Sequence, residues 1–280
     1  MTPRAGRAHA ASSLSRSLAS VFVVRLASVV RFLVVPPVLA VQLVLALLVV
    51  PPVLAAPPAP APSYEVTHTL TPAKALLAAD DKAWAAAATI AWGPAPYATR
   101  FRALWSPDGL YLRYDADDAA PWHTMTQRDE HIWEEEVVEI FLDADRSGHD
   151  YYELEISPAN VVCDLRMIDA SPWKGDFKFD LEGLETRVAA RKDDAGRTTG
   201  WTATALLPWK GLRALPSAAR VTTPPKAGDR WRFNVFRIER PGGKANPDKD
   251  AVEAAWSKPT ADSFHDPSVF RDMVFLAAAR

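Results

Sequence analysis

Cysteine is almost absent from this 280-residue sequence, in which Cys163 is the only one. A lone cysteine cannot form an intramolecular disulfide, so the folded part must be stabilised by a hydrophobic core. The residues from Tyr64 onward are numerous enough to build such a core. Cys163 itself, in "VVCDLRM", is expected to be a small buried residue on a strand.

The sequence also lacks a charge excess and several catalytic signatures. Its formal net charge is only −2, which argues against nucleic acid as a partner, because nucleic acid needs a basic face. We find no zinc-ligand spacing, no Gly-rich phosphate loop, no Ser or Cys nucleophile motif and no haem-attachment C-x-x-C-H. No organic cofactor is therefore expected. Internal repeats and long amphipathic helices are also missing.

Acidic residues are absent before Glu65, and the N-terminal region differs from the rest of the chain. Several arginines precede an apolar run, "FLVVPPVLAVQLVLALLVVPPVLAA", which ends in small residues suited to cleavage. We interpret residues 1–56 as an export signal and 57–63 as a Pro-rich spacer. An uncleaved membrane anchor is the alternative, since about 20 apolar residues can span a bilayer. The protein is then secreted or periplasmic in a bacterium, and it meets a membrane only if the segment is uncleaved.

The remainder, residues 64–280, shows short strand-like runs separated by turn residues. Four pairs of runs read as hairpins: "TRFRALW" with "LYLRYDADD", "EEVVEIFLD" with "HDYYELEIS", "LETRVAARK" with "GWTATALLP", and "DRWRFNVFRIER" with "VEAAWS". This spacing predicts an all-β fold, an antiparallel β-sandwich of jelly-roll type. One or two short helical turns are expected, in "PAKALLAADDKAWAAAA" and "PWKGL".

Carboxylates and aromatic residues alternate in the stretch "HIWEEEVVEIFLDADRSGHDYYELEIS". Because alternate residues of a strand face the same way, Val138, Ile140 and Leu142 should point into the core. Glu139 then lies on the opposite face, together with Glu153 and Glu155 of the returning strand. Such a mixed face suits a sugar, which offers C–H surface to rings and hydroxyls to carboxylates. A rim of salt bridges with arginines is the alternative, using Arg166, Arg237 and Arg240.

An ordered set of motifs carries a family resemblance. Trp133 precedes "EEEVVEIFLD", and "YYELEIS", "GWTATALLPWKGL", "FNVFRIER" and "AWSKPTADSFHDPSVFRDMVF" follow in that order. The chain resembles the family 9 carbohydrate-binding modules over nearly all of Tyr64 to Phe275. The likeness is greatest to the stand-alone exported branch of that family.

The resemblance implies a module that holds a sugar, or the end of a polysaccharide, between two aromatic rings without cleaving it. Here the rings are Trp133 and Phe264, and Glu139 stands where the family uses a Glu to accept sugar hydroxyls. Glu153 and Phe236 stand where xylanase-attached members have Arg and Gln. Trp122 and Arg237 complete the set of candidate sugar-binding residues. The implied partner is a mono-, oligo- or polysaccharide of plant cell-wall type, such as xylan or cellulose. The expected role of this monomer is to support polysaccharide breakdown.

Calcium is the one metal that the sequence suggests. Asp143, Asp145 and Asp150 lie in "DADRSGHD", which matches the first half of an EF-hand loop, although Leu154 occupies the twelfth position. The resemblance also implies structural calcium. An Asp-rich turn without an ion is the alternative.

Other functions remain open at this point. A glycoside hydrolase needs two carboxylates placed across a cleft, and Glu134, Glu135, Glu136 and Glu139 could supply them. A haem-binding sandwich would need axial ligands from the available His and Met residues. A structural or adaptor domain of the cell envelope, with a decayed sugar site, is the main alternative, because of Phe264 and the absent Arg and Gln.

Overall fold

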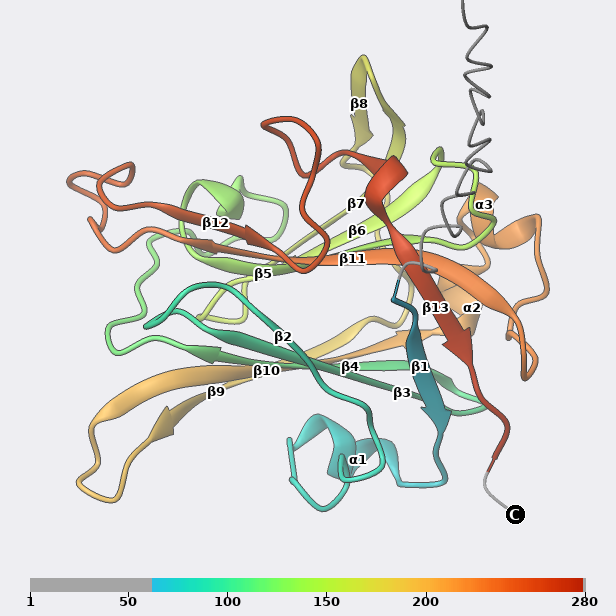
Figure 1. Cartoon of the computed structure of the whole chain (residues 1–280), viewed down its shortest axis with the longest axis horizontal. Helices are drawn as coiled ribbons and strands as arrows, with labels where there is room; N and C mark the ends of the chain where they lie inside the picture. The colour runs from blue at the N-terminus through green and yellow to red at the C-terminus, as the bar shows by residue number, and fades with distance from the viewer. Residues whose placement is uncertain (1–61, 279–280) are drawn as a thin grey trace, which may run out of the picture. The chain divides into compact units, whose positions relative to one another are not determined.

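A computed structural model describes residues 62–278, which form two layers of β-sheet (Figure 1). The predicted export signal, and all of the spacer except its last two residues, lie outside the described residues. Within residues 62–278, no helix has the length and apolar character needed to cross a bilayer.

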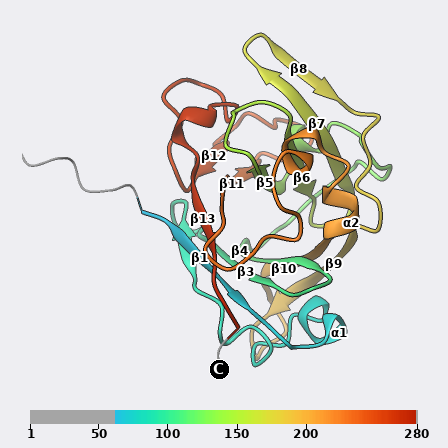
Figure 2. The same cartoon turned by 90° about the vertical axis from the view of Figure 1, so that its right-hand side faces the viewer.

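The first layer contains the strands that carry the acidic stretch. Its main order is β8-β7-β6-β5-β11-β13, and β12 pairs with β11. The strands are β5 (Val137–Asp143), β6 (Tyr151–Ile156), β7 (Val162–Ala170), β8 (Trp173–Asp176), β11 (Arg230–Glu239), β12 (Val252–Ala255) and β13 (Arg271–Phe275). The β7–β8 hairpin projects from the edge of this layer (Figure 1, Figure 2).

The second layer has the order β3-β4-β10-β9, with β2 paired to β3. Its strands are β2 (Ile90–Trp92), β3 (Thr99–Trp105), β4 (Gly109–Asp117), β9 (Glu185–Lys192) and β10 (Thr198–Pro208). Strand β1 (Tyr64–His68) joins the two layers, pairing in parallel with β13 and with β3. These two pairings depart from the antiparallel pattern that the sequence predicted. The other strand pairs of the described chain are antiparallel, and the all-β sandwich is confirmed.

Helical structure is limited to short turns. The two expected ones are present as α1 (Ala73–Leu77) and α2 (Trp209–Leu212). The structure adds α3 (Pro216–Ala219) and the 3₁₀ turns η1 (Ile132–Glu134) and η2 (Pro267–Val269).

All four predicted hairpins form, because turn chemistry and strand pattern agree. In the turn between β3 and β4, the Ser106 hydroxyl accepts from the Asp108 amide at 3.0 Å, and the Ser106 amide donates to the Gly109 carbonyl at 3.0 Å. Short polar turns of this kind fix the register of the strands that they join.

The main core lies between the layers. Val138, Ile140 and Leu142 face it, as the period-two pattern predicted, and it also contains Trp201 and Trp231. A second apolar cluster covers the outer face of the first layer and contains Phe141, Tyr151, Cys163, Phe236 and Phe270. The buried tryptophans include Trp84, Trp105, Trp201, Trp209 and Trp231. The second cluster matters most for function, because the candidate site is built on it.

Candidate functional site

A cavity of about 290 Å³ opens on the outer face of the first layer. Aromatic side chains and carboxylates dominate its lining. The lining residues are Trp133, Glu139, Phe141, Glu153, Glu155, Leu165, Trp173, Phe177, Ile238, Arg240, Glu253, Phe264 and His265. The chain segments that supply them lie far apart in the sequence and meet only in the folded protein.

The carboxylate floor of the cavity consists of Glu139, Glu153 and Glu155. Register places Glu139 of β5 directly opposite Glu155 of β6, and Glu153 opposite Phe141 one step along the same face. Like charges directly opposite each other destabilise an antiparallel pair. The arrangement therefore costs stability unless a proton or a ligand compensates the charge.

These three carboxyl groups are poorly satisfied in the free protein. Each is at least nine-tenths buried, and Oε1 of Glu139, Oε2 of Glu153 and Oε2 of Glu155 have no hydrogen-bond partner among the described residues. Burial, reinforced by neighbouring carboxylates, raises the pKa values of Glu139 and Glu155 well above the ordinary range. Burial also raises the pKa of Glu153, to about 8. Acceptor atoms of this kind are suited to groups brought in by a ligand.

Aromatic rings form the walls of the cavity. Trp133, at the middle of η1, stacks on His131 with 4.3 Å between the ring centroids. The Phe177 ring lies on Trp133 as well, with 6.0 Å between the centroids and 27° between the ring planes. Phe264 stacks on Phe236 at 4.3 Å and 21°. Trp173, on the projecting β8 strand, is 50% exposed at the rim. Both rings predicted to hold the sugar thus line one cavity.

His265 lies between the floor and the rim. Its ring stacks on Phe141 at 4.9 Å and 17°, and its Nδ1 lies 2.9 Å from the Tyr151 hydroxyl. The Trp173 indole N–H donates to Nε2 of His265 at 3.1 Å. Because an indole N–H can only donate, Nε2 must be unprotonated, so the imidazole is neutral. Burial accordingly lowers the pKa of His265 to about 4.

The sequence-predicted site residues divide into two groups. Trp133, Phe264, Glu139 and Glu153 line the cavity, whereas Trp122 and Arg237 do not. The Trp122 indole donates to the Arg240 carbonyl at 2.6 Å, so it lies behind a cavity residue.

Arg237 points to the opposite side of the first layer. It is fully buried, its guanidinium lies 4.8 Å from the Trp201 ring centroid, and it pairs with Glu239. Phe236 takes the cavity side at the preceding position, which alternation along β11 makes necessary. The residue parity that correctly placed Glu139 could have revealed this.

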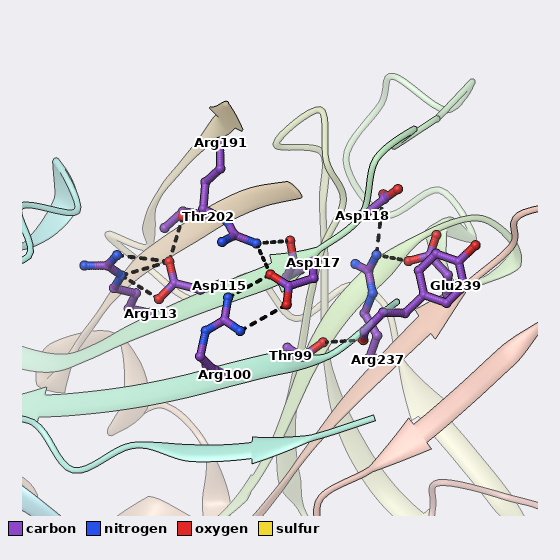
Figure 3. Close-up of polar contacts among 12 residues, drawn as sticks. Thr99, Arg100, Arg113, Asp115, Asp117, Asp118, Arg191, Thr202, Arg237 and Glu239 are labelled. Atoms are coloured by element: carbon purple, nitrogen blue, oxygen red, sulfur yellow. Dashed lines mark hydrogen bonds and ion pairs between the residues drawn. The ribbon is translucent and has the colours of Figure 1, made fainter. Parts of the chain in front are cut away.

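A separate acidic cluster lies around Arg237 (Figure 3). Oxygens of Asp118, Glu136 and Glu239 lie within 4.8 Å of one another, and all three side chains are buried. Burial, and then the neighbouring Glu239, raise the pKa of Glu136 to about 10. Clustered carboxylates could hold a hard cation such as calcium, although the Arg237 guanidinium already supplies positive charge there.

The predicted calcium ligands already have partners from the protein. Asp143 accepts from the backbone amides of Arg146 at 3.0 Å and Gly148 at 2.8 Å. Asp145 pairs with Arg220, and Asp150 pairs with both Arg166 and Arg220. A calcium ion at this turn would have to replace Arg220, so the assignment stays a prediction.

Sequence reasoning missed Trp173, Phe177 and Glu253 as cavity residues. Trp173 and Phe177 lie in "WKGDF", which has no strong strand pattern. Glu253 sits on the short strand β12, where its carboxylate binds Arg240 at 2.8 Å. A tryptophan in a turn-like segment was the one signal that the sequence offered, because indole rings often mark contact surfaces.

The chain is similar to known proteins in sequence and in fold. A model of the carbohydrate family 9 binding domain-like family matches residues 75–277. A protein of Arthroderma benhamiae called "Extracellular protein" is 29% identical over 189 residues, which are 64% of this chain and 78% of the relative.

Two solved structures share the fold. One is a family 9 carbohydrate-binding module from Caldicellulosiruptor kristjanssonii in complex with cellotriose, with a TM-score of 0.52 and 14% identity, covering 77% of this chain and 94% of the other. A putative carbohydrate-binding protein from Bacteroides uniformis has a TM-score of 0.56 and 15% identity, covering 76% and 97%.

Proposed function

The chain belongs to the carbohydrate family 9 binding domain-like family, and on that premise we propose that its cavity binds one end of a saccharide without cleaving it. The observation that carries the proposal is a cavity with aromatic walls over a carboxylate floor. Solved structures of a family 9 module from Caldicellulosiruptor kristjanssonii that share this fold are complexes with cellotriose and with glucose. We therefore propose glucose-based oligosaccharides as the first ligands to test.

The walls supply the apolar part of the binding energy. A sugar ring presents C–H surface, and covering about 100 Å² of it contributes about 2.5 kcal/mol at about 25 cal/mol per Å². Trp133 and Phe264 are both half-buried, so each has a ring surface left to offer. The His131 and Phe177 rings beside Trp133 limit its movement, which lowers the entropy lost on binding.

The carboxyl groups of the floor would orient the sugar through hydrogen bonds. Sugar hydroxyls are donors, and the free acceptor oxygens of Glu139, Glu153 and Glu155 face them. A hydrogen bond to a neutral carboxyl contributes about 0.5–1.5 kcal/mol and one to an ionised carboxyl about 1.5–3 kcal/mol, whereas association costs several kcal/mol. The expected dissociation constant lies between about 1 mM and 1 μM.

Calorimetric titration tests the proposal. The purified protein is titrated with glucose, cellobiose, cellotriose, xylobiose and their borohydride-reduced forms. Binding that disappears on reduction supports capture of the reducing end. Binding that persists on reduction would mean that another part of the saccharide occupies the cavity.

Trp133→Ala tests the position of the site. Loss of one wall should weaken cellobiose binding by at least about tenfold, with little change in melting temperature, because the ring is only half-buried. Leu70→Ala is the matched control: Leu70 is an apolar side chain, 87% exposed and outside the cavity, so binding should not change. Unaltered binding in Trp133→Ala would mean that the sugar binds elsewhere on the protein, and no sugar binding by the parent would favour an envelope adaptor instead.

We also propose an extracellular setting and a supporting role in polysaccharide breakdown. The fungal relative's name supports the setting. Hydrolysis of cellobiose by the parent protein, lost in Glu139→Gln, would contradict the non-catalytic role.

A further inference from the structure

The cavity gathers more carboxyl groups than its own side chains can pair with positive charge. Glu139, Glu153 and Glu155 form the floor, and Glu253 adds a fourth carboxylate. Arg240 is the only guanidinium among the described residues that line the cavity, and it binds Glu253 at 2.8 Å. The three floor carboxylates therefore lack a cationic partner.

Neighbouring basic groups do not reach the floor. Arg237 lies on the other face of the sheet, paired with Glu239, and Arg166 pairs with Asp150. His265 comes closest, with Nδ1 3.9 Å from a Glu153 oxygen. Its Nε2 accepts the Trp173 indole N–H, which holds the ring in its neutral form.

The walls favour a cation as well. Trp133, Trp173, Phe177 and Phe264 surround the same space. Aromatic faces attract positively charged groups, more strongly when the groups are removed from water. Floor and walls thus select for the same property of a ligand.

We propose that the preferred ligand is a saccharide with a free amino group, a glucosamine-type unit whose ammonium pairs with Glu139 and Glu155. This inference rests on the proposed sugar-binding function. A neutral sugar donates hydrogen bonds to the floor but brings no positive charge to favour ionisation of the floor's buried carboxyl groups. An ammonium group supplies both the donors and the missing positive charge.

A matched set of disaccharides tests the preference. Cellobiose and the β-1,4-linked glucosamine dimer differ in the group at C2, and N-acetylation of the dimer removes its charge. We expect the glucosamine dimer to bind at least about tenfold more tightly than cellobiose at a pH where its amines are protonated. The acetylated dimer should lose this advantage.

Variants of the floor locate the effect. Glu155→Gln should reduce the ratio of the two affinities toward one, and Glu153→Gln should reduce it less. Glu182→Gln, at an exposed carboxylate outside the cavity, should leave the ratio unchanged. Melting curves check that each variant is folded.

The possible results distinguish a failure of the amino-sugar preference from a failure of the proposed sugar binding. Equal binding of the glucosamine dimer and cellobiose would overturn the amino-sugar preference and leave sugar binding intact. Binding of neither would overturn both. Ethanolamine, an ammonium without a sugar ring, should not compete; if it binds as tightly as the dimer, the site recognises amines and the inference fails.

Discussion

Among the described residues, buried carboxylates on the outer face of the second layer are paired with arginines, whereas those on the outer face of the first layer are not. On the second layer, Arg113 donates to both oxygens of Asp115 at 3.0–3.2 Å, and the Thr202 hydroxyl adds a bond at 2.8 Å (Figure 3). Asp117, close by, accepts from Arg100 and Arg191. Burial opposes ionisation of Asp117, but these two guanidinium groups hold its pKa below the ordinary value.

On the first layer, by contrast, the carboxylates face one another. Glu139 lies opposite Glu155, and no guanidinium within residues 62–278 binds either of them. Burial raises their pKa values, whereas pairing lowers that of Asp117. The comparison separates two roles for a buried charge: a paired carboxylate stabilises the fold, and an unpaired one is available to a ligand.

The largest expected effect on stability comes from removing the Arg113–Asp115 ion pair of the second layer. Arg113→Leu would leave Asp115 buried without its guanidinium, since Arg113 and Asp115 side chains are only 8% and 7% exposed. We expect the free energy of unfolding to fall by about 3 kcal/mol, measured by denaturant titration. Arg197→Leu, at an exposed surface pair, should cost less than about 1 kcal/mol. Equal effects of the two variants would mean that the network contributes no more than an ordinary surface pair.

For the first layer, the sequence was enough to predict which carboxylates share a face. Period-two alternation placed Glu139, Glu153 and Glu155 on one face, and the turn residues between the two strands implied that they pair. The four hairpins followed from the same local rules. Local pattern succeeds here because hairpin register depends only on nearby residues.

The rest depended on contacts between distant segments. Trp173 and His265 meet at 3.1 Å although they are 92 residues apart in the chain, and nothing in either segment specifies the other. The parallel pairings of β1 are of the same kind. Arg237 differs, since alternation along β11 already placed it opposite the cavity.

A second prediction concerns pH and sharpens the contrast. Burial raises the pKa of Glu153 from 4.5 to about 8 in the folded protein, so the folded state holds this proton longer than the unfolded state. Its stabilising contribution is complete below about pH 4.5 and is lost as pH rises through about 8. Ionisable groups facing Glu153 across the cavity are Glu139, Glu155, Glu253, Arg240 and His265.

We expect titration of Glu153 alone to lower the free energy of unfolding of the free protein by about 3 kcal/mol between pH 5 and pH 8, with a slope of at most about 1.4 kcal/mol per pH unit for one proton. Denaturant unfolding at several pH values measures this loss. Other carboxyls with raised pKa values, among them Glu139, Glu155, Glu136 and Asp143, contribute to the parent curve. The informative quantity is therefore the difference between parent and Glu153→Gln. A Glu153→Gln curve parallel to that of the parent would show that Glu153 does not titrate in this range.

The smallest expected effect is a gain in stability, opposite in sign to the loss expected for Arg113→Leu. Glu155→Gln removes one of two directly opposed carboxylates and gives Glu139 an amide donor at the paired position. We expect it to stabilise the free protein by about 1 kcal/mol at pH 8, measured by denaturant unfolding. The same substitution should weaken binding of an amino sugar, because the amino group then loses one of the two carboxyl groups with which it is proposed to pair. Destabilisation by Glu155→Gln would instead show that the Glu139–Glu155 pair shares a proton that stabilises the fold. The cavity floor would then resemble the paired side of the molecule rather than contrast with it.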